Sequence, residues 1–292
     1  MDPSQRYLFD TFGYVRIPGV LTAEEVALLN SGIDRHAHDF HERTGPVRNS
    51  EIGNGGRRDC GNFLSWPDSD GGAVFRSLLC HPNLVPVLNE VCGLGHRLDH
   101  SPLLFSQPTG AEGFDLHGGA VKSDGSLNFP ISYRCQNGHI VCSLVNVAVQ
   151  LSDCEKGSGG FVVVPGSHKS NFYPPDLPTI AENFGHQPEC EAGDVILFTE
   201  AILHGASVRV AKQDRRVVLI RFAPPTCAYA RGYLEPDDYR MLLTPAQCAV
   251  VAPPYHLDQD RPAPVLGTVS VPHRRKADKK AFDRTVFDKD YY

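Results

Sequence analysis

The chain has 292 residues, of which 41% are hydrophobic and 21% are charged. These fractions are ordinary for a globular protein and exclude a fibrous or wholly disordered chain, and the length fits one large elaborated domain. The formal net charge of −6 provides no general attraction to nucleic acid, so we predict no nucleic-acid partner.

The cysteines and the apolar runs of the sequence indicate where in the cell the protein is located. The nine cysteines form no CxxC pair, which argues against a disulfide framework and against a structural zinc site. No apolar run approaches the roughly 18 residues needed to cross a bilayer, and residues 1–31 lack the basic start and apolar middle of a signal peptide. We therefore expect a cytoplasmic protein with no membrane partner.

The first third of the chain predicts helices and a long loop. Residues 7–18 are rich in aromatic side chains and predict a short strand and a turn. Thr22 and Glu25 form a capping-box pattern ahead of apolar positions at helical spacing, which predicts an amphipathic helix. Residues 44–72 lack periodicity and predict the loop, whereas residues 73–93 predict two short helices.

From residue 97 onward the pattern changes to short strands separated by turns. Residues 140–151 alternate small or polar side chains with valines, which predicts a long strand. Shorter β-branched runs follow at 161–164, 195–198 and 217–222. Helices followed by regularly spaced strands predict a mainly β fold with flanking helices, and the double-stranded β-helix, or cupin-like jelly roll, fits this order best.

We expect this architecture to form a single domain over residues 1–292. A helical N-terminal elaboration is predicted over residues 1–96, and the jelly-roll core over residues 97–225. Residues 226–292 are rich in proline and charge and are predicted to form a C-terminal extension.

Two histidines stand at predicted strand ends. His117 lies in Phe114-Asp-Leu-His-Gly-Gly119, and His204 lies in Thr199-Glu-Ala-Ile-Leu-His-Gly205. A jelly roll can bring such histidines together at its mouth, where imidazole nitrogens bind Fe, Zn or Cu. The tract at residues 36–41 has three histidines, but it lies on the first helix or its exit and is expected to be solvated.

The segments around these histidines carry a family resemblance. They are residues 12–25, 157–169, 193–198 and 215–220. Their order and spacing resemble the phytanoyl-CoA dioxygenase family of Fe(II)/2-oxoglutarate-dependent oxygenases over most of residues 7–225. The resemblance implies that His117 and His204 bind iron, and that 2-oxoglutarate and dioxygen are co-substrates.

The same resemblance implies an arginine on the strand that follows the second histidine. In the family a planar guanidinium at this place binds the far carboxylate of 2-oxoglutarate through two parallel hydrogen bonds. Arg215 has the matching position. Arg216 is adjacent and would point to the opposite face of the strand, so only one of the two can take this role.

Gly119 departs from the His-x-Asp pattern, in which an aspartate completes the iron site. Three explanations stay open. A halide occupies the position, as in halogenases of the same superfamily that carry a small residue there. Alternatively, water or another acid, such as Glu200, Asp115 or Asp124, completes the site, or iron does not bind productively. We expect Glu200 to orient a histidine or loop by hydrogen bonding. Asp115 is expected to be a turn or sheet-edge carboxylate.

Further polar side chains are predicted at the mouth of the jelly roll. Tyr133 and Arg134 precede the long strand and are candidates for contact with the co-substrate or an acidic substrate. Asn146 lies among small residues on one face of that strand, as suits a wet interior. Gln107 stands near the place where relatives carry a polar residue that binds the co-substrate.

The resemblance implies a dioxygenase that hydroxylates an unactivated C–H bond of a small-molecule substrate and forms succinate and carbon dioxide from 2-oxoglutarate. Halogenation is the alternative that Gly119 motivates, with halide as an additional cofactor. A non-catalytic jelly roll that keeps the pocket for ligand binding is the second class of function, because a fold does not by itself dictate chemistry.

Overall fold

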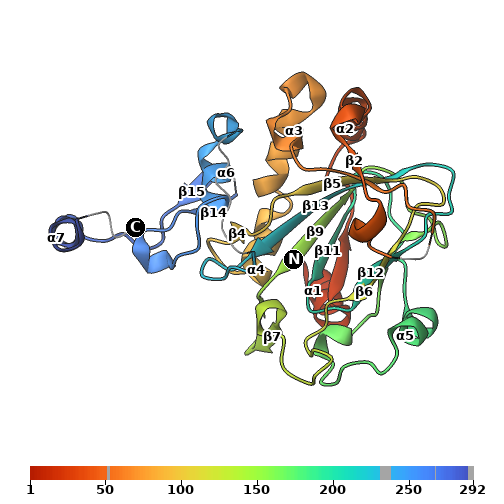
Figure 1. Cartoon of the computed structure of the whole chain (residues 1–292). Helices are drawn as coiled ribbons and strands as arrows, with labels where there is room; N and C mark the ends of the chain where they lie inside the picture. The colour runs from red at the N-terminus through yellow and green to blue at the C-terminus, as the bar shows by residue number, and fades with distance from the viewer. Residues whose placement is uncertain (51–52, 231–237, 267, 289–292) are drawn as a thin grey trace.

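The structure is a computed structural model that describes residues 1–50, 53–230, 238–266 and 268–288 (Figure 1). The α-helices are α1 (Pro3–Phe12), α2 (Ala23–Arg35), α3 (Gly72–Ser77), α4 (Val85–Val91), α5 (Leu177–Phe184), α6 (Pro245–Val250) and α7 (Ala277–Phe287). The strands are β1 (Tyr14–Ile17), β2 (His41–Glu42), β3 (Arg58–Cys60), β4 (Arg97–Leu98), β5 (Leu103–Gln107), β6 (Phe114–His117), β7 (Tyr133–Gln136), β8 (His139–Cys142), β9 (Val145–Gln150), β10 (Gly160–Val163), β11 (Val195–Thr199), β12 (His204–Ser207), β13 (Arg215–Ala223), β14 (Ala263–Val265) and β15 (Thr268–Ser270). Within the described ranges, no helix is both long enough and apolar enough to span a bilayer.

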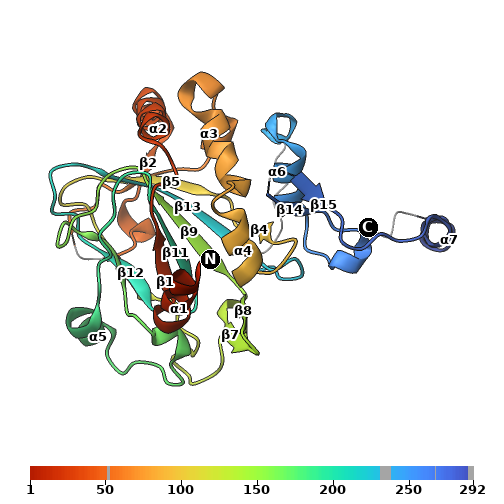
Figure 2. The ribbon, with the colours of Figure 1, turned by 180° about the vertical axis from the view of Figure 1, so that it is seen from behind.

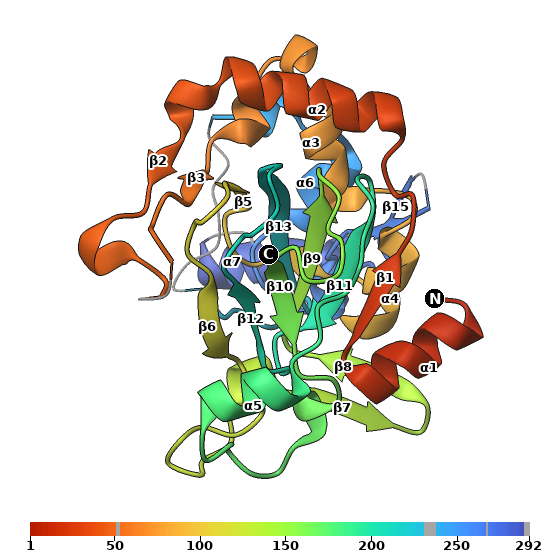
Figure 3. The ribbon, with the colours of Figure 1, turned by 90° about the vertical axis from the view of Figure 1, so that its right-hand side faces the viewer.

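Two antiparallel sheets form the centre of the molecule. The large sheet has eight strands, seven in the order β1-β11-β9-β13-β5-β3-β2 and β4 beside one end of β13. The small sheet has the order β10-β12-β6. In Figure 3 the small sheet lies in front of the large one, and α2 crosses above both. This arrangement confirms the predicted mainly β jelly roll with flanking helices.

Side chains on β9 and β13 alternate between two cores. Val147 of β9 and Val218 of β13 face the helices and join the larger core, together with Leu29 of α2. Ala148 and Val217 face the other way and join the smaller core between the sheets. Because successive side chains of a strand point to opposite faces, one pair of strands supports the helices with one face and lines the interior of the jelly roll with the other.

The N-terminal segment contributes strands as well as helices. The predicted capping box is confirmed, since the Thr22 side chain accepts from Glu25 N and the Glu25 side chain accepts from Thr22 N at the start of α2. However, β1, β2 and β3 all join the large sheet, so the segment expected to be a helical elaboration also builds the sheet. The turn after β1 was expected, but α1 was not, because Phe9 is its only buried residue and leaves little periodicity to detect.

The strand predicted over residues 140–151 is interrupted. Ser143 and Leu144 separate β8 from β9, and β8 pairs with β7 in a hairpin that belongs to neither the large nor the small sheet. The break takes β8 out of the large sheet, and Ile140 and Cys142 of β8 pack in the larger core.

The C-terminal segment extends from the end of the large sheet. The helix α6 packs against the hairpin of β14 and β15, and α7 projects furthest from the sheets (Figures 1 and 2). This segment therefore lies apart from the interior of the jelly roll.

Candidate metal centre

The two predicted histidines lie side by side across the small sheet. His117 ends β6, His204 begins β12, and the two are paired in register with ring centroids 4.1 Å apart. His117 Nδ1 lies 3.0 Å from the carbonyl oxygen of Asp115, and His204 Nδ1 lies 2.9 Å from that of Ile202. A carbonyl oxygen can only accept, so each Nδ1 carries the proton and each Nε2 keeps a lone pair for a metal.

Glu200 supplies a carboxylate to the same place. It lies in the turn between β11 and β12, and its Oε1 is 3.8 Å from His204 Nε2. One donor atom from each of His117, Glu200 and His204 lies within 4.8 Å of the others. Sequence reasoning expected Glu200 to act through hydrogen bonds, yet its carboxylate faces the open nitrogen side of the histidine pair.

The far oxygen of this carboxylate is held by neighbouring strands. Asn146 Nδ2 donates to Glu200 Oε2, and Arg221 Nε lies 3.9 Å from the same oxygen. Burial acts to raise the pKa of Glu200, but the nearby His204 and Arg221 outweigh it and hold this pKa below its ordinary value. The group is therefore an ionised carboxylate at neutral pH, with Oε1 turned toward His204.

This donor set fits a divalent metal ion of the iron type. Two imidazole nitrogens and one carboxylate oxygen form the facial arrangement of non-haem Fe(II) oxygenases, which leaves coordination positions open for a co-substrate. Burial lowers the pKa of His204 to about 4, so its ring is neutral, as a metal ligand must be.

A cavity of about 200 Å³ lies beside the histidines and is also lined by a buried arginine. Arg215 lines this cavity and is 3% exposed. Its Nη1 donates to Gln107 Oε1 at 3.4 Å, and its Cζ lies 5.2 Å from the centre of the Phe105 ring. In the part of the chain that the structure describes, Arg215 Nε has no hydrogen-bond partner.

The incomplete bonding of Arg215 fits an anionic ligand. Burial lowers the pKa of this guanidinium to about 10, which still leaves it charged at neutral pH. A buried donor without a partner costs roughly 1–3 kcal/mol, and a carboxylate entering the cavity would relieve that cost while forming the stronger charge-assisted bond. The cavity therefore provides a metal centre at one place and a carboxylate site at another.

Arg216 takes no part in this cavity. Its guanidinium donates to Asp34 of α2 and to Asn30 Oδ1, the latter at 3.1 Å. The expected alternation along the strand is therefore observed, with Arg215 on the interior face and Arg216 on the helix face.

Gly119 offers no side-chain ligand to the histidine pair. A Cβ at this position would approach Leu203 Cδ2 to 3.3 Å, and the residue has φ of +90°. Asp115 is exposed and accepts from Ser50 Oγ at 2.9 Å, whereas Asp124 accepts from the backbone and hydroxyl of Ser126 in a turn. Of the three acids considered as replacements for an aspartate, only Glu200 reaches the histidines.

Tyr133 and Arg134 lie at a different hollow, of about 590 Å³, with Lys169. The Tyr133 hydroxyl donates to Asp10 of α1, and Arg134 is exposed. The prediction that they contact the co-substrate is not supported, because neither residue lines the cavity that contains Arg215. Gln107, in contrast, lies beside Arg215, and its Nε2 donates to the carbonyl oxygens of Glu112 and Ser207.

Arg57 and Arg221 also line the cavity. Arg221 follows Arg215 on the same face of β13 at an even spacing. Arg57 donates to Asp59 Oδ1 at 2.9 Å and stacks over Phe105, with its Cζ 4.2 Å from the ring centre. It belongs to an aperiodic stretch, so no local pattern marks it.

Comparison with known proteins agrees with this geometry. Residues 9–217 match the family described as phytanoyl-CoA dioxygenase (PhyH). No curated protein matches the sequence of this chain.

Several solved structures share the fold. HygX from Streptomyces hygroscopicus, solved with nickel and 2-oxoglutarate bound, has a TM-score of 0.62 and 25% identity, over 79% of this chain and 90% of HygX. The 2-oxoglutarate-dependent epimerase SnoN from nogalamycin biosynthesis has a TM-score of 0.56 and 18% identity, over 76% of this chain and 83% of SnoN. The carbocyclase SnoK from the same biosynthesis has a TM-score of 0.55 and 15% identity, over 84% of this chain and 92% of SnoK.

Proposed function

Since this chain belongs to the phytanoyl-CoA dioxygenase family and is an iron- and 2-oxoglutarate-dependent enzyme, we propose that it hydroxylates a C–H bond of a small-molecule substrate. In this reaction one atom of dioxygen becomes the hydroxyl group of the product. The other atom enters 2-oxoglutarate, which loses carbon dioxide and becomes succinate. Bound iron supplies the oxidising chemistry, and the protein supplies the ligands, the carboxylate site and the cavity.

One observation carries the proposal, the convergence of His117, Glu200 and His204 beside a cavity that Arg215 lines. We assign the three converging residues as the iron ligands. Each histidine is fixed in the tautomer that a metal requires, and Asn146 fixes the carboxylate from β9. Such fixed ligands need little rearrangement to bind the ion.

Arg215 is the proposed site for the far carboxylate of 2-oxoglutarate. Its Nε lacks a partner among the described residues, and Gln107 holds its Nη1 from the neighbouring strand β5. A planar guanidinium can bind a carboxylate through two parallel hydrogen bonds, which fixes the orientation of the co-substrate.

Glu200 favours hydroxylation over halogenation. Halogenation requires a coordination position that a halide can take, and Gly119 motivated that alternative. However, the Glu200 carboxylate lies within 4.8 Å of donor atoms of both histidines, so the chain itself offers a third ligand. Hydroxylation therefore needs no ligand beyond those that the chain already brings together.

Proteins with the same fold are described with other reactions, so the product assay has to distinguish these reactions from hydroxylation. HygX has been solved with hygromycin B bound, SnoN is described as an epimerase and SnoK as a carbocyclase. Hydroxylation adds one oxygen atom to the substrate, epimerisation leaves its mass unchanged, and oxidative ring closure removes two hydrogen atoms. Mass spectrometry thus separates the three outcomes.

Metal and co-substrate binding can be tested before a substrate is known. The iron-loaded protein is titrated with 2-oxoglutarate without oxygen, and the visible absorption band of the metal-bound 2-oxo acid is recorded. We expect the band in the wild type and in His139→Ala, a control at an exposed histidine on β8, and its loss in His204→Ala and Glu200→Ala. A full band in Glu200→Ala would contradict the assignment of the third ligand.

The reaction outcome is tested with a panel that starts from hygromycin B and nogalamycin RO, the small molecules bound in HygX and SnoN structures. Succinate and product mass are measured with iron, 2-oxoglutarate and oxygen, and again with added chloride or bromide. We expect succinate to form in step with a product that has gained one oxygen atom. A coupled product that contains halogen, or one with unchanged mass, would contradict hydroxylation.

A further inference from the structure

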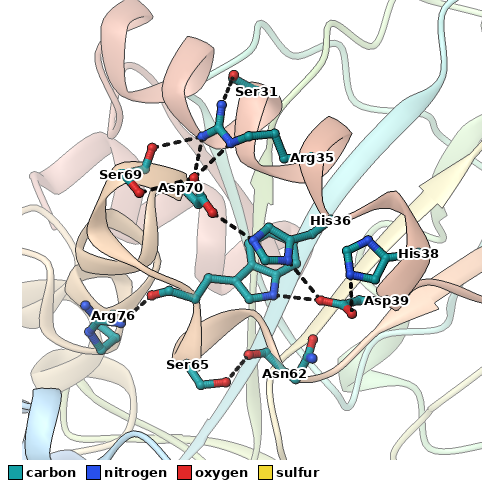
Figure 4. Close-up of polar contacts among 11 residues, drawn as sticks. Ser31, Arg35, His36, His38, Asp39, Asn62, Ser65, Ser69, Asp70 and Arg76 are labelled. Atoms are coloured by element: carbon teal, nitrogen blue, oxygen red, sulfur yellow. Dashed lines mark hydrogen bonds and ion pairs between the residues drawn. The ribbon is translucent and has the colours of Figure 1, made fainter.

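A second group of metal-binding side chains lies at the end of α2, outside the cavity of the proposed iron site. His36 caps the C-terminus of α2, and His38 and Asp39 belong to the single 3₁₀ turn that follows it (Figure 4). Within the described part of the chain, none of these three lines the cavity that contains His117 and His204. The proposed function uses none of them.

The donor atoms of this group are spaced as metal ligands are. His36 Nδ1 lies 3.0 Å from Asp39 Oδ2, and His38 Nε2 lies 3.4 Å from Asp39 Oδ1. One donor atom from each residue lies within 4.8 Å of the other two. Ligand atoms at about 2.0–2.2 Å from one ion are about 3–3.5 Å apart, so these pairs need little movement to share a cation.

His36 is oriented by a carboxylate on its far side. Its Nε2 lies 2.9 Å from Asp70 Oδ2, and Arg35 Nε donates to the other oxygen of Asp70 at 2.8 Å. In a neutral ring, donation from Nε2 to Asp70 leaves the Nδ1 lone pair facing Asp39. A carboxylate that fixes the outer nitrogen of a ligating histidine is a recurrent arrangement in protein metal sites.

Trp66 restrains the side chains of His36 and Asp39. Its indole stacks on His36 with ring centroids 4.2 Å apart and an interplanar angle of 13°, and its Nε1 donates to Asp39 Oδ2 at 3.2 Å. The side chains of His36 and Asp39 are 19% and 20% exposed, whereas that of His38 is 75% exposed. An ion can therefore reach the open His38 side while the other two ligands are already held in place.

We propose that His36, His38 and Asp39 form a second binding site, for a divalent transition-metal ion such as Zn²⁺ or Ni²⁺, with water completing the coordination. Two imidazoles and one carboxylate suit such ions better than Ca²⁺ or Mg²⁺, which prefer oxygen ligands. The bound ion links the end of α2 through His36 and Asp70 to the 3₁₀ turn at residues 68–70.

Trp66 is the only tryptophan of the chain, so its fluorescence reports on this site. The full-length protein is titrated with NiCl₂, whose paramagnetic ion quenches a neighbouring indole, and then with ZnCl₂, which does not quench and competes. We expect quenching that saturates with increasing Ni²⁺ and recovery of fluorescence with Zn²⁺. Quenching that rises linearly without saturation would overturn the proposal.

Three variants test whether the fluorescence quenching arises from Ni²⁺ bound at the proposed second site. His38→Asn is expected to weaken the apparent affinity at least tenfold without altering the circular dichroism spectrum, because this side chain is largely exposed. His256→Asn is the matched control, since His256 is an exposed histidine whose Nδ1 lies 3.5 Å from Asp258. His204→Ala removes a proposed iron ligand and should leave the quenching unchanged. If His38→Asn binds Ni²⁺ with the affinity of the wild type, His38 is not a ligand and the proposed three-residue site is overturned.

Discussion

Replacing Gly160 by alanine is expected to displace Arg215 without removing any proposed ligand. Gly160 begins β10 with φ of +121°, and a Cβ there would lie 2.7 Å from Arg215 Cδ and 2.8 Å from Arg215 Nε. Non-bonded carbon atoms normally stay about 3.5–4.0 Å apart. The end of the Arg215 side chain must therefore retreat by about 1 Å from the place where we assign the 2-oxoglutarate carboxylate.

The expected loss follows from the bonds that this shift breaks. A hydrogen bond to a charged group contributes about 1.5–3 kcal/mol, and about 1.4 kcal/mol corresponds to a tenfold change in affinity. The Kd for 2-oxoglutarate should therefore rise about 10- to 100-fold. The positive φ should also lower the free energy of unfolding by roughly 1–2 kcal/mol.

Anaerobic titration of the iron-loaded variants with 2-oxoglutarate measures this effect. Gly157→Ala is the control for positive φ, because Gly157 has φ of +75° and a Cβ there meets no atom within 4 Å. Its Kd should stay near that of the wild type. In an Arg215→Ala background, Gly160→Ala should change the Kd by no more than about twofold, since the group it displaces is already absent. An unchanged Kd for Gly160→Ala alone, or an equal loss in both backgrounds, would refute the role given to Arg215.

Three further outcomes follow from the same structure. Arg216→Ala should leave 2-oxoglutarate affinity unchanged. It should lower the free energy of unfolding by about 0–1 kcal/mol, because its partner Asp34 is a surface group on α2. A large rise in the Kd for 2-oxoglutarate would contradict the assignment of strand faces. Asn146→Ala should weaken iron binding about 10- to 100-fold, measured by competition with a chelator, because Glu200 loses the donor that holds it. Burial lowers the pKa of His168 to about 4, whereas the unfolded chain has about 6.5, so the stability from this group is full above pH of about 6.5 and declines as pH falls toward 4. His168→Gln should flatten that part of a urea-unfolding pH profile, and an unchanged slope would exclude His168 as its source.

The sequence predicted those parts of the fold that depend on local patterns. The capping box of Thr22 and Glu25 marks the start of α2 because its two hydrogen bonds involve residues only three apart. The break between β8 and β9 was missed, because apolar residues continue on both sides of Ser143 in residues 140–151. Pairing partners, which decide where a strand ends, are distant in sequence and leave no local mark.

The candidate site, like the fold, could be predicted from the sequence only in part. The face of β13 that carries Arg215 follows from the two-residue period of a strand, whereas Arg216 could be set aside only once α2 was seen on the opposite face. Glu200 stands in a turn, where side-chain direction depends on the path of the backbone and not on a repeating period. Its approach to His117, which is far away in sequence, is a property of the two sheets and could not be deduced from residues 199–205 alone.

The turn between β11 and β12 brings together Glu200 and His204, so two of the three proposed iron ligands belong to a single segment of five residues. The strand β6 then has to supply only His117. In a site built on His-x-Asp, the chain directly after the first histidine must follow the path that presents the aspartate. Here Gly118 must stay a glycine, because a Cβ there would lie 2.4 Å from Ile202 O and 2.8 Å from Glu200 O. Residues 120–132 carry no proposed ligand, so they can change in length and sequence to suit different substrates while the proposed metal centre stays intact.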